Sequence, residues 1–142
     1  MNTDQPTALP PSLDGLRDLG DRMGYYNTNE HKLFIAHTAI AAVAAAFGVT
    51  EKQIMGRRRT DLIASARQTA MWICRTQGKM PYNEIGGLFA DRDHGTAIHA
   101  VKAVEGRRLT SLKFRAVADA VADYVRAKVR ERGQVEEPVD NK

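Results

Sequence analysis

The sequence predicts an all-α domain of about six helices, and three observations support this. Apolar residues make up 43% of the 142 residues and charged residues 27%, as in ordinary soluble globular proteins. In the middle of the chain the apolar residues recur at helical spacing. The glycines and prolines lie mostly near the ends or between those periodic segments, where they interrupt helices. A chain of this length can bury one core without disulfides or metal.

The first confident helix covers residues 30–47, where apolar side chains repeat with helical period and Gly48 follows as a C-terminal cap. Residues 50–53 then read Thr-Glu-Lys-Gln. This order is a capping box, in which threonine and glutamine side chains satisfy backbone N–H groups at a helix start. It predicts a short helix that carries Ile54 and Met55 and ends at Gly56.

Four further helices are expected in the rest of the chain. One begins between Leu62 and Ser65 and runs to about Gln77, with Gly78 as its terminator. Pro81 introduces a helix over 82–89, and Asp93 caps one over 94–105 that Gly106 breaks. Thr110 or Ser111 caps the last, which ends near Arg132. The expected core positions of the last three helices are Ile85, Leu88, Phe89, Ile98, Val101, Val104, Val117, Val121, Tyr124, Val125 and Val129.

These elements divide the chain into three parts. Residues 1–28 are expected to be a flexible segment with one short helix at 12–24, residues 29–132 a helical domain, and residues 133–142 a disordered acidic tail. The N-terminus has no signal-peptide pattern and no apolar run approaches the length of a membrane span, so the expected location is the cytoplasm. Cys74 lies in an apolar stretch and is expected to be a small buried hydrophobe.

Positive charge is concentrated in one half of the chain. The net charge is +4, yet residues 57–108 contain ten Lys and Arg against five Asp and Glu. Basic charge gathered in this way favours a nucleic-acid partner, because contacts to phosphates release counterions.

The helices expected at 82–89 and 94–105, joined by a tight turn, have the proportions of a helix-turn-helix. In that motif the N-terminal residues of the second helix read base edges in the major groove. Asp93, His94 and Thr96 are hydrogen-bonding side chains at this position, and Gly95 stands among them. The motif therefore predicts contact with duplex DNA.

No enzyme, cofactor or metal site is expected. Asp91 and Asp93 are explained by turn and capping roles, and no grouping of nucleophile, base and orienting residue is evident. The spacing of His94 and His99 does not bring two imidazoles together on a helix. His94 is expected to be exposed and His99 half-buried.

The run from Ile85 to Ala100, IGGLFADRDHGTAIHA, resembles the C-terminal DNA-binding domain of the bacterial replication initiator DnaA. The signature of that family is approximately IG-x-x-F-G-G-R-D-H-T-T-V-x-H-A. The resemblance extends upstream to Arg57-Arg58-Arg59 and to Arg67-Gln68-Thr69-Ala70-Met71, and covers about residues 40–108.

The resemblance implies a role for each matching residue. Arg59 would enter the minor groove, Asp93 to Thr96 would read the major groove, and Arg67, Gln68 and Arg75 would lie against the DNA backbone. The full set expected to contact DNA is Arg57, Arg58, Arg59, Arg67, Gln68, Arg75, Asn83, Arg92, Asp93, His94, Gly95, Thr96, His99 and Lys102.

Three residues depart from the family pattern. Gly95 stands where the family has a threonine, Asn83 where it tends to have a proline, and Asp91 where it has a glycine. The preferred DNA site is therefore expected to differ from that of the family. No GxxxxGK[ST] phosphate loop is present, so we expect a stand-alone module without the ATPase and without a bound nucleotide.

The function expected from these observations is sequence-specific binding of double-stranded DNA by a nucleoid-associated bacterial protein, with no membrane partner. A transcriptional regulator, for example of a prophage-like element or gene transfer agent, is the first interpretation. One alternative is an accessory that binds replication origins. Another is an interaction adaptor, which would dock RNA polymerase or a regulatory protein through the last helix and residues 12–24.

Overall fold

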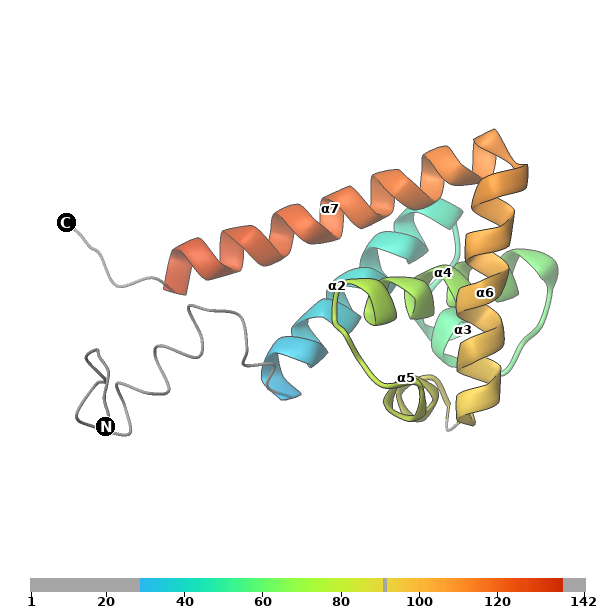
Figure 1. Cartoon of the computed structure of the whole chain (residues 1–142), viewed down its shortest axis with the longest axis horizontal. Helices are drawn as coiled ribbons and strands as arrows, with labels where there is room; N and C mark the ends of the chain where they lie inside the picture. The colour runs from blue at the N-terminus through green and yellow to red at the C-terminus, as the bar shows by residue number, and fades with distance from the viewer. Residues whose placement is uncertain (1–28, 91, 137–142) are drawn as a thin grey trace, which may run out of the picture.

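The computed structural model describes residues 29–90 and 92–136, and in this part of the chain every regular element is a helix (Figure 1). This confirms the all-α prediction. The expected helix at 12–24, the remainder of 1–28, Asp91 and residues 137–142 lie outside the described residues. No described helix is both long and apolar enough to cross a membrane. The helices are α2 (Asn29–Phe47), α3 (Glu51–Met55), α4 (Asp61–Thr76), α5 (Tyr82–Leu88), α6 (His94–Thr110) and α7 (Leu112–Glu136).

Helix α4 lies at the centre of the domain and packs against both α2 and α6. Most of its side chains from Ile63 to Cys74 are buried, and Ala66, Ala70 and Ile73 are inaccessible to solvent. Helix α7 crosses α2 and α6 along one side, and α5 with the start of α6 lies on the opposite side (Figure 1). The fold therefore presents the helix-turn-helix away from α7.

Local capping groups set several helix boundaries. At α3, the Thr50 Oγ1 accepts the Gln53 N–H at 3.0 Å and the Gln53 Oε1 accepts the Thr50 N–H at 2.9 Å, which confirms the capping box. Gly48 has a φ of 70° and ends α2, as expected. Thr60 caps α4 by accepting the Ile63 N–H at 3.4 Å. Helix α4 therefore begins at Asp61, slightly earlier than predicted.

The break expected at Gly106 is wrong, since α6 continues to Thr110. A helical glycine costs only about 1 kcal/mol relative to alanine, which tertiary contacts can offset. One such contact is the Arg107 Nη1, which donates to the Ser65 Oγ at 2.9 Å. Ser111 caps α7 as expected, because its Oγ accepts the Phe114 N–H at 3.1 Å. The boundary expected near Arg132 is also wrong, since α7 continues to Glu136.

Burial follows the predicted core at most positions. Among the expected core residues, Leu88, Ile98, Val117 and Val129 are only partly buried, whereas Tyr124 is 51% exposed and does not belong to the core. Cys74 is fully buried, and burial raises the pKa of its thiol to about 12, which confirms its role as a small hydrophobe.

Candidate nucleic-acid interface

The turn between α5 and α6 is closed around Gly86. The Gly86 carbonyl oxygen accepts the Arg92 N–H at 2.8 Å and the Phe89 N–H at 3.2 Å. A Cβ atom at Gly86 would overlap the Arg92 carbonyl group and lie 2.9 Å from the Asp93 carbonyl oxygen. Only glycine allows the two helices to approach this closely. The geometry confirms the predicted helix-turn-helix, with α6 as its second helix.

Asp93 caps the start of α6, as predicted. Its Oδ1 accepts both the backbone N–H and the hydroxyl of Thr96, each at 2.9 Å, and these bonds hold the pKa of the exposed carboxyl below its usual range. The Thr96 hydroxyl spends its proton on this bond, so its oxygen remains able to accept from a base amino group. His94, Gly95 and Thr96 are all exposed, which confirms the prediction for His94.

The basic loop between α3 and α4 is joined to this turn through one backbone oxygen. The Gly56 carbonyl oxygen accepts from the Arg92 Nη2 at 2.9 Å and from the Arg67 Nη2 at 3.0 Å. The Arg92 Nη1 also donates to the Phe89 carbonyl oxygen at 2.5 Å. Three exposed side chains, Arg57, Arg58 and Arg59, follow directly after Gly56.

The loop and the turn share one positive field. The pKa of Arg92 is lowered first by burial and then by the charges of Arg57 and Arg59. These arginines therefore lie close enough to repel one another, and a partner with negative charge would relieve that repulsion. The start of α6 and the basic loop thus form one cationic surface, which is suited to a polyanion.

Arg67 does not take the expected place on the DNA backbone, because its side chain is only 5% exposed. Besides the bond to Gly56, its Nε donates to the Ile54 carbonyl oxygen at 2.7 Å and its Nη2 to the Gln53 carbonyl oxygen at 2.9 Å. It therefore satisfies carbonyl groups at the end of α3. The guanidinium fixes the base of the basic loop from inside the domain.

A model of the bacterial DnaA protein helix-turn-helix matches residues 36–104 of this chain. Residues 36–104 form a DNA-binding domain of the DnaA helix-turn-helix type. The chain is 44% identical over 66 residues to a chromosomal replication initiator protein, DnaA 2, of Protochlamydia amoebophila, which covers 46% of this chain and 14% of the relative.

Two further relatives give the same result. Identity to the chromosomal replication initiator DnaA of Dechloromonas aromatica is 40% over 67 residues, covering 47% of this chain and 14% of the relative. For the DnaA of Rhodopseudomonas palustris it is 31% over 102 residues, covering 72% and 20% respectively. The chain therefore spans only 14 to 20% of the length of these relatives.

Within the DnaA-type domain, Arg75 contacts the protein's own backbone. Its Nη1 donates to the Met80 carbonyl oxygen at 3.0 Å, and its guanidinium lies 4.1 Å from the centre of the Tyr82 ring. Arg75 is thus partly used to position the start of α5. Gln68 is partly buried, and its Oε1 has no hydrogen-bond partner among the residues that the structure describes.

The exposed face of α6 extends the DnaA-type interface along the helix. Gly95, His99 and Lys102 are all exposed, and their spacing of four and three residues places them on one face. The half-buried environment expected for His99 is therefore wrong, because the buried face of α6 is formed instead by Ala97, Ala100, Val101 and Val104. Asn83 is exposed near the start of α5.

Sequence reasoning missed the structural role of Gly56. Its contribution is a backbone oxygen, so no side-chain pattern marks it. The one signal available was its position, between the end of a short helix and a run of three arginines.

Proposed function

We propose that this chain binds duplex DNA sequence-selectively as a non-enzymatic protein, with the start of α6 in the major groove and the Arg57–Arg59 loop in the adjacent minor groove. The observation that supports this most is the bond pair at the Gly56 oxygen, which ties the basic loop to the helix-turn-helix. Polar side chains at the start of α6 suit base edges. Arginines suit a narrow, electronegative minor groove.

Replacing Arg59 by alanine tests the minor-groove contact. We expect Arg59→Ala to weaken binding to the preferred site by about 1–3 kcal/mol and to relax the preference at the base steps that the loop contacts. Fluorescence anisotropy with the selected site and with scrambled DNA, both at physiological salt, measures this.

The matched control is Arg130→Ala, which removes an exposed arginine from α7 on the other side of the domain. It should leave affinity almost unchanged. Equal affinity of the unaltered protein for selected and scrambled DNA would contradict sequence-selective binding. Equal losses in the two variants would show that only total charge matters.

Gly95 tests the major-groove contact, because the DnaA signature has threonine at this position. A Cβ at Gly95 would meet the Asp93 Oδ1 at 3.6 Å, an ordinary contact, so threonine fits without rearrangement. We expect Gly95→Thr to add a preference for thymine at one position, since a threonine methyl packs against the thymine methyl. Selection of sites from random duplex DNA measures the change. Gly106→Ala, in open space on the same helix, is the control. Identical selected motifs for Gly95→Thr and the unaltered protein would refute this contact.

For the biological role we propose transcriptional regulation, for example of a prophage-like element or gene transfer agent, by a nucleoid-associated protein in the bacterial cytoplasm. The support is an exposed reading surface on a compact domain. The names of the relatives favour a second candidate, an accessory that binds replication origins. Genome-wide occupancy distinguishes them, because peaks at promoters favour regulation and peaks at the origin favour the accessory. Occupancy without intrinsic DNA preference would favour an adaptor that docks RNA polymerase.

A further inference from the structure

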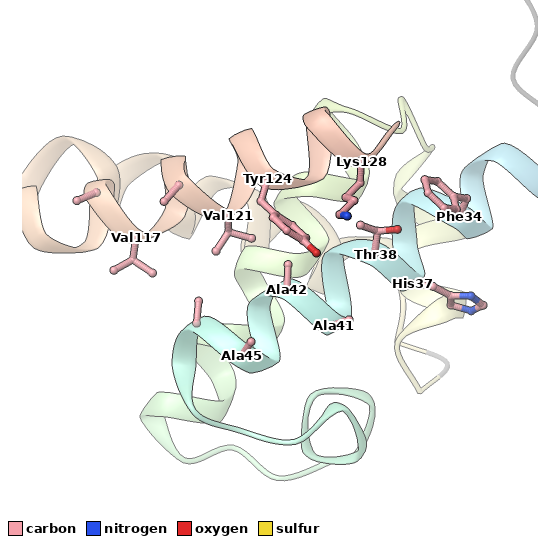
Figure 2. A pocket seen from close by; sticks show the side chains of 13 residues that line it. Phe34, His37, Thr38, Ala41, Ala42, Ala45, Val117, Val121, Tyr124 and Lys128 are labelled. Carbon is pink, nitrogen blue, oxygen red and sulfur yellow. The ribbon is translucent and has the colours of Figure 1, made fainter. Parts of the chain in front are cut away.

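A groove of about 1040 Å³ runs between α2 and α7, away from the DNA-reading surface (Figure 2). Its lining is mostly apolar. Phe34, Ala41 and Ala45 contribute to it from α2, and Val117, Val121 and Tyr124 from α7. Among these, Ala41, Ala45 and Tyr124 are exposed to solvent. An apolar surface of this kind is normally covered by another element or partner.

The groove stays open because the two helices meet at their ends and are lined by small residues between them. At one end the Arg132 guanidinium lies 4.6 Å from the centre of the Phe34 ring. At the other end the Phe47 and Phe114 rings lie 6.4 Å apart. The alanine side chains between these ends are too short to fill the space.

We propose that residues 12–23 of this chain bind this groove as a helix that runs antiparallel to α2. The lining of the groove on α2 extends from Phe34 to Ala46, which is about 18 Å at 1.5 Å per residue. Residues 12–23 form a helix of the same length. Residues 24–28 remain to connect it to α2, a usual length for a turn between antiparallel helices.

The pattern of residues 12–23 fits the groove. On a helix, Leu13, Leu16, Leu19 and Met23 share one face with Gly20, while Asp14, Asp18 and Asp21 lie on the opposite side. Gly20 would let this face approach the alanines of α2 closely. Each helical glycine costs about 1 kcal/mol, so burial of the leucines must supply the stability of this helix.

Charge favours the same orientation. Lys128 and His37 line the Phe34 end of the groove (Figure 2). An antiparallel helix places Asp21 at this end, because it lies close to the connection into α2. The C-terminal residues 137–142 are a poorer occupant, since six residues cannot span the groove.

Disulfide trapping in the full chain tests the proposal. The antiparallel register places residue 16 beside residue 41, so the test variant carries Leu16→Cys and Ala41→Cys. The control carries Asp18→Cys and Ala41→Cys, with the new thiol on the opposite face of the segment. Native Cys74 stays in place, because its buried thiol, with a pKa of about 12, does not compete. Equal urea midpoints, followed by fluorescence of the buried Trp72, verify that both variants are folded.

We expect the test variant to form an intramolecular disulfide several-fold faster than the control, as measured by non-reducing electrophoresis and peptide mass spectrometry. Adding Leu19→Asp to the test variant should slow the reaction, whereas adding Arg17→Asp should not. Equal rates in test and control variants would overturn the proposal, because a mobile tether reacts without facial preference. Disulfides predominantly between two molecules would also overturn it, in favour of a second copy of the chain as the occupant.

Discussion

Gly86→Ala is expected to destabilise the domain by about 3 kcal/mol or more and to abolish DNA binding. The added methyl would overlap the Arg92 carbonyl group and press on the Asp93 carbonyl oxygen, neither of which belongs to a flexible side chain. Relief requires the turn to move away from α5. That movement would break the Arg92 N–H bond to Gly86 and displace the start of α6. Urea unfolding followed by Trp72 fluorescence measures the loss.

The adjacent glycine provides a matched control for this substitution. A Cβ at Gly87 would meet no atom within 4 Å, and the residue also lies in α5. Gly87→Ala should therefore be neutral or stabilise the domain by about 0.5 kcal/mol, because alanine is the better helix former. If both variants lost the same stability, the close approach at Gly86 would not be the cause.

Arg67→Ala is expected to lower the free energy of unfolding by about 3 kcal/mol. The substitution removes a buried guanidinium and leaves the Gln53, Ile54 and Gly56 carbonyl oxygens without these donors. DNA affinity should fall as well, because the basic loop begins at Gly56. Chemical denaturation and anisotropy on the same samples measure both losses.

Two further variants separate burial from charge. Arg58→Ala removes the same charge from an exposed position, so it should leave the unfolding free energy nearly unchanged. Arg67→Lys keeps the charge but cannot reproduce the fork of donors, and should recover only part of the stability. Equal unfolding free energies for Arg67→Ala and Arg58→Ala would refute the structural role.

Features set by neighbouring residues could be predicted from the sequence. The capping box at Thr50 and Gln53, the cap at Asp93 and the cap at Ser111 each depend on a hydrogen bond across three residues. Their side chains therefore identify them without knowledge of the fold. The same locality explains why the turn between α5 and α6 was predictable.

Features set by distant packing could not be predicted in the same way. Arg67 reads as a phosphate contact until α3, which is 13 residues away, is seen to cover it. The continuation of α6 through Gly106 depends on contacts such as that between Arg107 and Ser65, which are 42 residues apart. His99 and Tyr124 were misplaced for a related reason, because helical periodicity alone does not fix which flank of a helix its neighbours cover.

The shared oxygen of Gly56 also constrains what kind of DNA site this domain can tolerate. Arg67 and Arg92 hold it from two sides, so the origin of the basic loop has a fixed offset from the start of α6. The domain therefore acts as a ruler between its two reading points. Changes of base within a site alter individual contacts, but inserting or deleting one base pair between the two grooves shifts one contact by about 3.4 Å and rotates it around the duplex. Spacing should consequently be more stringent than sequence.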